Sequence, residues 1–171
     1  MLKLKLATDP RWVNLAQKNI SDILTDHAYC EQKAATSCIS LIVVYPDLKP
    51  IVESLTPIVS EEWSHFSLVI KEIYKRGYVL GYARKDEYVN ELLSFQNKNG
   101  SREEVLVEKL LTNALIEARS CERFRLLSLE LEDSYLKKFY HNFMVSEAGH
   151  YRLFMDLARI YKTTSYVDNR W

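Results

Sequence analysis

The stretch SEAGHY, residues 146–151, decides the fold prediction because it places Glu147 and His150 three residues apart in an apolar pattern of helical period. Side chains spaced alternately by four and three residues lie on one face of an α-helix. The same face also carries Leu136, Tyr140, Phe143, Phe154, Leu157 and Tyr161. A carboxylate and an imidazole are therefore predicted to point into a core, where an unpaired charge costs several kcal/mol or more. The rest of the chain must supply their partners.

Four further polar residues on apolar helical faces can serve as these partners. A second Glu-x-x-His pair, Glu62 and His65, occurs in the stretch SEEWSHF. Its helical face is completed by Leu55, Ile58, Val69 and Ile73. Two single glutamates, Glu31 and Glu117, lie on apolar faces of the helices predicted to precede the two pairs. Each half of the sequence thus has one glutamate followed by one Glu-x-x-His pair, at similar separations.

Capping and helix-breaking residues divide the chain into helices and turns. Asp9-Pro10 is typical of a helix start, and Ser21 can cap a second helix. Tyr45-Pro46 ends that helix because the residue before proline avoids helical angles. The stretch from Ser101 to Glu104 has the pattern of a capping box. The predicted helices cover about 10–19, 22–44, 47–76 with a restart or kink at Thr56-Pro57, 86–95, 101–131 and 135–161. Residues 162–171 are predicted to form an extended tail.

The four long helices form two predicted hairpins joined by a weakly patterned segment, residues 77–100, in which a long crossover is expected. The predicted fold class is all-α, a four-helix bundle with a long crossover and extra short helices. A chain of 171 residues suits one domain, and no linker interrupts it, so residues 1–171 are predicted to form a single domain.

Composition excludes several classes of protein. Only four glycines and four prolines occur, which disfavours an all-β architecture. Lys and Arg total 23, as do Asp and Glu, so the average surface does not strongly attract nucleic acid or an anionic membrane. Three scattered cysteines without a C-x-x-C motif indicate reduced thiols. With no signal peptide or membrane-spanning stretch, the sequence predicts a cytoplasmic protein without membrane partners.

The six inward polar residues have the donor types of a di-metal centre. Carboxylate-bridged di-iron and di-manganese bundles use one glutamate from each of two helices and a Glu-x-x-His pair from each of the other two. The predicted metal ligands, and hence the catalytic residues, are Glu31, Glu62, His65, Glu117, Glu147 and His150. Four carboxylates offset the charge of two divalent cations, and Glu62 and Glu147 are the natural bridging ligands by this analogy.

The fourth carboxylate has a competing candidate. Glu122 follows Cys121 as Glu31 follows Cys30, so an alignment on this dipeptide selects Glu122. Glu117 is preferred because its helical face is apolar and its spacing matches that of the first half. Glu122 is then expected to form ion pairs with neighbouring arginines or to contact substrate. His27, four residues before Glu31, could hydrogen-bond to that ligand from outside the metal shell, but a solvated side chain or ordinary core packing explains its position at least equally well.

Five stretches together resemble one enzyme family: LTDHAYCEQKAA, SEEWSHF, KRGY, ALIEARSCERF and SEAGHY. The chain is similar from about residue 11 to residue 161 to the tRNA 2-methylthio-isopentenyladenosine hydroxylases, which are ferritin-like non-haem di-iron monooxygenases acting beside the anticodon. The resemblance implies hydroxylation of the isopentenyl group with two iron ions and dioxygen. It also implies two macromolecular partners, the anticodon loop of a modified tRNA and an electron-donating reductase.

A basic and aromatic segment near the crossover offers a place for RNA. The basic residues are Lys71, Lys75, Arg76, Arg84 and Lys85, and the stacking candidates are Tyr74, Tyr78 and Tyr82. Ordinary solvated charges and packing tyrosines explain the same pattern equally well. Two other functions stay open for the whole chain: a ferritin-like ferroxidase or peroxide-reducing di-iron protein, and a non-catalytic helical interaction module. Only the last predicts that no iron is bound.

Overall fold

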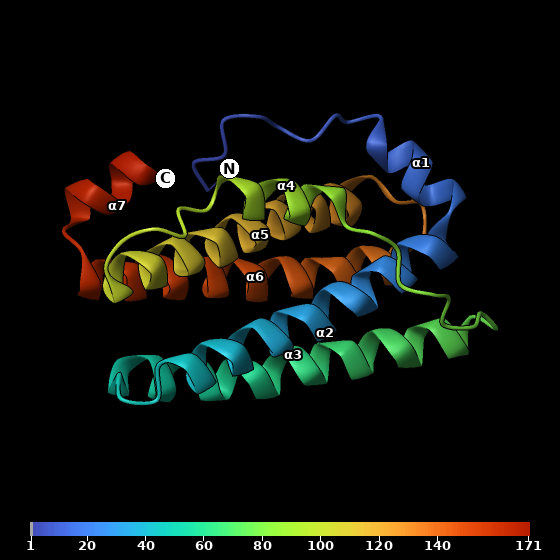
Figure 1. Ribbon diagram of the computed structural model, residues 1–171. Coiled ribbons are helices and arrows are strands. Elements are labelled where there is room, and N and C mark those ends of the chain that lie inside the picture. Colours follow the sequence, from blue (N-terminus) through green and yellow to red (C-terminus); the bar gives the residue numbers. More distant parts are fainter. Residues whose placement is uncertain (1) are drawn as a thin grey trace. The chain divides into compact units, whose positions relative to one another are not determined.

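The computed structural model describes residues 2–171 and contains seven α-helices in that range (Figure 1). No strand occurs among these residues, as the sequence predicts. Contacts divide the described chain into two compact units. One unit comprises residues 18–85, with α2 and α3. The other comprises residues 2–17 and 86–171, with most of α1 and all of α4, α5, α6 and α7.

The first unit is an antiparallel hairpin of α2 (Ile20–Val44) and α3 (Lys49–Lys75) (Figure 1). The apolar faces predicted from helical spacing form its core, and the members that are almost fully buried include Leu24, Ala28, Cys38, Leu55, Val69 and Ile73. A helix of this length is stabilised mainly by burial of such a face rather than by intrinsic propensity. The core therefore confirms the helical period.

The ends of these helices differ in part from the prediction. The prediction that Ser21 caps α2 is wrong, because the helix already begins at Ile20 and the amide of Ile23 donates to the carbonyl of Asn19. Asn19 is the N-cap residue, without a side-chain capping bond. At the other end of the hairpin, α3 continues through Pro57 as one helix. The predicted end of this helix at about residue 76 is confirmed, and Gly77 follows it with a φ of +73°, a left-handed angle that glycine adopts most readily.

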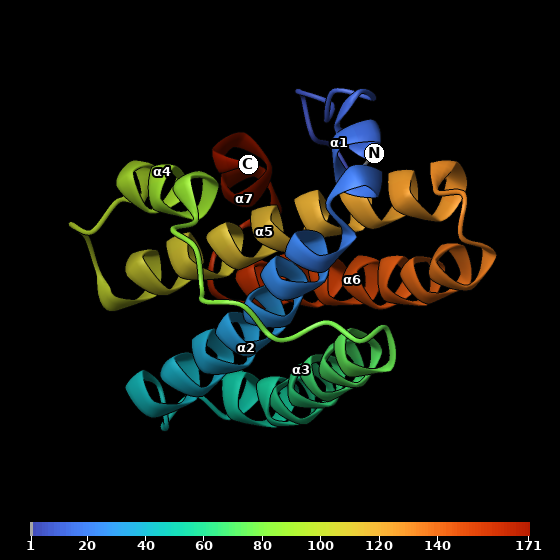
Figure 2. The same ribbon diagram turned by 90° about the vertical axis from the view of Figure 1, so that its right-hand side faces the viewer.

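After α3 the chain crosses α2 as an extended segment, residues 77–85, which we call the crossover strap (Figure 2). The hydroxyl of Tyr29 donates to the carbonyl of Gly81 at 3.0 Å, and the amide of Gly81 donates to Thr25 Oγ1 at 3.4 Å. Arg84 adds hydrogen bonds to Asp26, the shortest at 2.6 Å, and two to Asp22, one to its carboxylate at 3.2 Å and one to its carbonyl at 3.4 Å. The strap is thus fastened to α2 by both backbone and side chains.

The second unit is built on a hairpin of α5 (Arg102–Glu130) and α6 (Ser134–Tyr161), with α1 (Trp12–Lys18) and α4 (Glu87–Phe95) beside it. The predicted capping box is present, with Ser101 accepting from the amide of Glu104 and the Glu104 carboxylate accepting from the amide of Ser101. Its core includes Leu106, Leu110, Ala114, Phe124, Leu136, Tyr140 and Phe154. All of these residues except Leu106 come from the apolar faces that helical spacing predicts for the two helices.

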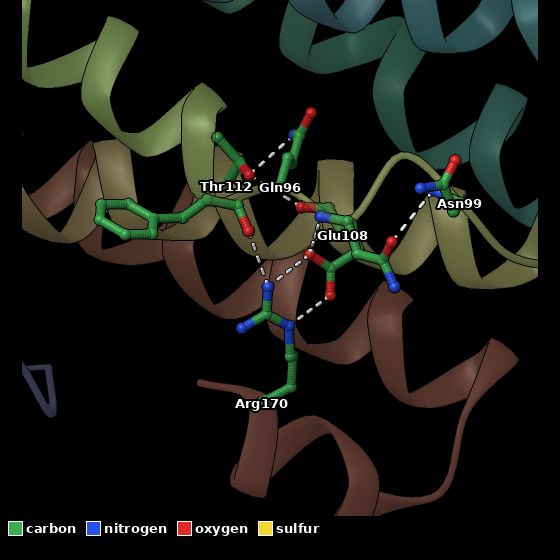
Figure 3. Close-up of polar contacts among 7 residues, drawn as sticks. Gln96, Asn99, Glu108, Thr112 and Arg170 are labelled. Atoms are coloured by element: carbon green, nitrogen blue, oxygen red, sulfur yellow. Dashed lines mark hydrogen bonds and ion pairs between the residues drawn. The ribbon is translucent and has the colours of Figure 1, made fainter.

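The predicted extended tail is wrong, because residues 164–170 form a seventh helix, α7 (Thr164–Arg170). Thr163 caps it by accepting a hydrogen bond from the amide of Tyr166, and Val167 is fully buried. Arg170 reaches the buried Glu108 on α5 through two hydrogen bonds of 2.6 and 2.8 Å (Figure 3). A helix this short is marginal on its own, and Glu108, which anchors it through Arg170, lies far away in the sequence. The local pattern therefore gave no signal for it.

Replacing Glu108 by glutamine is expected to lower the free energy of unfolding by about 1–2 kcal/mol at neutral pH, because the ion pair with Arg170 is lost. Burial alone raises the pKa of the Glu108 carboxyl, but hydrogen bonds from Arg170 and the Asn97 amide outweigh burial and lower it. The folded pKa of Glu108 is therefore lower than its pKa of 4.5 in the unfolded chain. The ion pair stabilises the fold above pH 4.5, and this stabilisation is lost as pH falls through the folded pKa.

Urea unfolding of both proteins at neutral and at acidic pH checks this expectation. The difference between the wild type and Glu108→Gln should shrink as pH falls below the unfolded pKa. Glu130→Gln, at an exposed position on the same helix, is the matched control and should change little. A difference that is the same at both pH values would contradict the ion-pair account of α7 anchoring.

Candidate metal centre

The first unit brings three of the predicted ligands together as the α2–α3 cluster: Glu31, Glu62 and His65. One ligand atom from each lies within 4.8 Å of those of the other two. His65 Nδ1 is 3.3 Å from Glu31 Oε2 and 3.7 Å from Glu62 Oε2. Glu31 and Glu62 are 3% and 1% exposed, so both carboxylates have left water. Helical spacing explains why the three side chains lie together, because Glu62 and His65 are one turn apart on α3 and Glu31 faces them from α2.

His27 supports this cluster from one turn earlier on α2. Its buried Nε2 lies 2.6 Å from Glu31 Oε1, a distance at which the imidazole N–H donates to the carboxylate. The sequence left His27 open between this role and ordinary core packing. The geometry favours the first role, in which His27 fixes the orientation of the Glu31 carboxylate.

The charges in the α2–α3 cluster compensate one another without a metal. Burial alone lowers the pKa of His65, but its contacts with the Glu31 and Glu62 carboxylates, which accept from the imidazole and carry negative charge, outweigh burial and raise the pKa to about 10. Burial alone raises the pKa of Glu31, yet hydrogen bonds from His27 and His65 outweigh it and lower the pKa well below its usual range. These two directions favour an imidazolium between two carboxylates as the charge state of the cluster when no metal is bound. A divalent cation would have to displace that proton, because a metal binds the neutral imidazole.

Replacing His27 by leucine is expected to weaken metal binding by about 10- to 100-fold, because the hydrogen bond that orients Glu31 is removed. His27→Gln keeps an N–H donor and should retain most of the affinity. Anaerobic Fe²⁺ titration against a chelating indicator measures both variants beside the wild type. Equal losses in the two variants would mean that packing, and not the hydrogen bond, is the contribution of His27.

The second unit brings the other three predicted ligands together as the α5–α6 cluster: Glu117, Glu147 and His150. Their ligand atoms also lie within 4.8 Å of one another, and the three residues are 4%, 3% and 3% exposed. Nearby, the Cys121 thiol donates to the carbonyl of Met144 at 3.3 Å. Burial raises the pKa of this thiol to about 11, with the charge of Glu117 adding to the effect. A neutral thiol is a poor metal ligand, so the donors of this cluster are carboxylates and imidazole.

Glu122, the competing candidate for the fourth carboxylate, is engaged elsewhere. It accepts hydrogen bonds from the amide and hydroxyl of Thr8 and forms an ion pair with Arg119. Burial alone raises the pKa of Glu122, but these partners lower it. Its expected role in ion pairing is therefore observed, and Glu117 is the glutamate of α5 that lies beside Glu147 and His150.

Comparison with known proteins identifies the family. Residues 2–171 match the family described as tRNA-(MS[2]IO[6]A)-hydroxylase (MiaE). The chain belongs to this family. A MiaE relative from Pseudomonas putida, a tRNA 2-(methylsulfanyl)-N(6)-isopentenyladenosine(37) hydroxylase, is 34% identical over 154 residues, which cover 90% of this chain and 74% of the relative. A Salmonella typhimurium hydroxylase of the same name is 28% identical over 204 residues, covering 91% and 75%.

A solved structure has the same fold as this MiaE family member. Protein 43 with aldehyde deformylating oxygenase activity from Synechococcus matches with a TM-score of 0.93 and 30% identity, over 98% of this chain and 82% of that one. The likeness confirms the predicted all-α, ferritin-like fold class. None of the helices within residues 2–171 combines the length and apolar character needed to cross a membrane.

Sequence reasoning missed how the predicted RNA-binding segment is held. Three of its basic residues form ion pairs inside the first unit. Arg76 and Lys75 pair with Glu72, at 2.5 and 3.9 Å, and Arg84 pairs with two aspartates of α2. The bonds of Gly81 to Thr25 and Tyr29 were also missed, because a hydroxyl and a backbone group more than fifty residues apart leave no pattern along the chain. The remaining lysines and tyrosines of the segment stay at the surface.

Proposed function

We propose that this protein hydroxylates the isopentenyl group of 2-methylthio-N6-isopentenyladenosine beside the anticodon of tRNA, with dioxygen, at a centre of two iron ions. The observation that carries the proposal is the match to the MiaE family over residues 2–171, in a chain whose two units each hold one buried Glu, Glu, His cluster. The curated relatives named above are hydroxylases of this nucleoside.

The donor set fits iron. Carboxylates and imidazoles suit ferrous iron, and four glutamates with two histidines match the composition of known di-iron bundle sites. We propose that the α2–α3 and α5–α6 clusters together provide the six ligands, with Glu62 and Glu147 bridging and Glu31 and Glu117 terminal. This centre requires the two units to work as the single domain that the sequence predicts. Bound iron would supply dioxygen reduction and oxidation of a carbon–hydrogen bond.

The residues of the chain have three tasks in this reaction. The carboxylates hold compensating negative charge, the buried surroundings limit the access of water, and His27 fixes the orientation of Glu31. The balance of hydroxylation is one substrate carbon–hydrogen bond, one dioxygen, two electrons and two protons giving one alcohol and one water. The two electrons must come from outside the chain, which is why we include a reductase among the proposed partners. A tRNA substrate places the reaction in the cytoplasm.

The proposal is tested with protein reconstituted anaerobically with Fe²⁺. The substrate is tRNA bearing 2-methylthio-N6-isopentenyladenosine, supplied with oxygen and a chemical or enzymatic electron source. Nucleosides from digested tRNA are analysed by mass spectrometry, and the expected product has gained one oxygen atom on the isopentenyl group. Transfer RNA lacking the prenyl group is the matched substrate control.

Three outcomes are informative. The hydroxylated nucleoside, formed only with iron and oxygen, supports the proposal. Oxidation of added Fe²⁺ or consumption of peroxide with no change in the nucleoside would overturn it in favour of a ferroxidase or peroxide-reducing protein. Absence of iron binding would overturn the metal centre itself and leave a helical interaction module as the better account.

A further inference from the structure

The crossover strap holds an aromatic ring out into solvent. Tyr82 is 97% exposed, and Val79, three residues earlier, is 77% exposed. Tyrosine normally buries much of its ring, because the ring contributes a large apolar area. A ring exposed to this degree buries little apolar area and so contributes almost nothing to the stability of the fold. Its position therefore calls for an explanation outside the stability of the chain.

The backbone on either side of this ring is fixed. Gly81, directly before it, makes the two hydrogen bonds to Thr25 and Tyr29, and Arg84, two residues after it, pairs with Asp26 and Asp22. Tyr82 is thus presented from a fastened segment, which lowers the entropy cost of using the ring in binding.

Two lysines near the strap offer positive charge. Residues 77–85 include two basic residues, Arg84 and Lys85, and no acidic residue. The charge of Arg84 is compensated by Asp22 and Asp26, so Lys85 is the one that remains available. Lys85, like Lys71 on the last turns of α3, is exposed and forms no ion pair with any residue in the described range 2–171. Lys71 shares a helical face with Tyr74, which is 58% exposed. Lysines without an acidic partner remain available to phosphate groups.

The strap crosses α2 close to the proposed metal ligand of that helix. Its two fastening residues, Thr25 and Tyr29, lie six and two positions before Glu31 on the same helix. At a rise of 1.5 Å per residue these offsets are about 9 Å and about 3 Å along the axis. A ligand held on the strap therefore lies level with the turn of α2 that carries Glu31, but on the other side of the helix, because two positions correspond to a rotation of about 200°.

We propose that the crossover strap is a contact surface for single-stranded RNA, with Tyr82 stacking on an unpaired base and Lys71 and Lys85 meeting phosphates. Exposed aromatic rings beside basic side chains are the usual means of binding single-stranded nucleic acid, and sequence-specific RNA recognition mostly uses unpaired loop bases. This inference rests on the proposed function, in which the partner is the anticodon loop of a tRNA.

The first test measures the affinity of iron-loaded protein for a fluorescent anticodon stem-loop RNA. Tyr82→Ala is expected to weaken binding about tenfold, within the range known for the loss of one base-stacking ring. Tyr82→Phe keeps the ring and should bind like the wild type. Tyr135→Ala removes another exposed tyrosine, 49% exposed on α6, and should change nothing. The same RNA closed as a fully paired duplex should not respond to Tyr82→Ala.

The second test uses salt dependence. Replacing Lys85 by alanine is expected to weaken RNA binding and to reduce the slope of log affinity against log salt by about 0.7, the value for one phosphate contact to a single strand. Lys138→Ala, at an exposed site on α6, is the control and should leave the slope unchanged.

The results separate this inference from the proposed function. If the wild type hydroxylates tRNA while Tyr82→Ala binds the stem-loop and reacts as the wild type does, the strap is not the RNA contact. If Tyr82→Ala raises KM about tenfold and leaves kcat unchanged, the ring acts in RNA binding alone, as proposed. If the wild type binds no RNA, both the strap proposal and the proposed substrate are overturned.

Discussion

Glu62→Ala is expected to lower the iron content from about two ions per chain to less than one. The reason is that a bridging carboxylate serves both metals in carboxylate-bridged centres. Glu147→Ala, the equivalent change in the α5–α6 cluster, should have the same effect. Hydroxylation of the nucleoside should fall by at least about a hundredfold in both variants, more than the loss expected from changing a residue that only supports a ligand. Iron analysis after anaerobic reconstitution and the nucleoside assay measure the two quantities.

A control on the same helix separates loss of metal from loss of fold. Glu53 is exposed on α3, where its carboxylate pairs with Lys49, and Glu53→Ala should load iron normally. The metal-free form of Glu62→Ala should stay folded, because His65 keeps the Glu31 carboxylate as a partner. A folded Glu62→Ala or Glu147→Ala protein that still holds two irons and hydroxylates tRNA would refute the bridging assignment.

The sequence predicted the helices and the two clusters because both depend on spacing along one chain. Around Glu147 and His150 the apolar residues are spaced alternately by four and three positions, which predicts the buried face of α6. The same spacing on α3 places Glu62 beside His65. Pairing of α2 with α3 follows from the short turn between them, which brings Glu31 to the pair. These features need no knowledge of distant contacts.

What the sequence could not predict depends on contacts between distant segments. The helix α7 exists because Val167 is buried and Arg170 reaches Glu108, sixty-two residues earlier. The fastening of the crossover strap likewise joins Gly81 to Tyr29, fifty-two residues away. The raised pKa of His65 is a third case, since the Glu31 and Glu62 carboxylates that outweigh burial meet His65 only in the folded cluster.

Metal loading is expected to raise the thermal midpoint by roughly 10 °C, because a ligand present at a thousand times its dissociation constant stabilises the folded state by about 4 kcal/mol. Removal with a chelator should reverse the gain. Differential scanning calorimetry of anaerobic Fe²⁺-loaded and metal-free protein measures it. Glu62→Ala should show almost no gain at the same metal concentration, which separates specific binding from a general effect of the cation.

The size of this gain should depend on pH in a direction fixed by His65. Its folded pKa, about 10, lies above the ordinary value of 6.5, so the stability that it gives the metal-free protein is complete below 6.5 and is lost as pH rises toward 10. Metal binding must expel the same proton, so metal affinity should rise about tenfold per pH unit in this window, adding about 1.4 kcal/mol of stabilisation by metal for each pH unit.

Calorimetric titration in buffers of different ionisation enthalpy should detect release of about one proton from His65 per centre. A metal-induced gain that stays constant between about pH 7 and about pH 8 would show that His65 is neutral before the metal arrives, or that it is not a ligand.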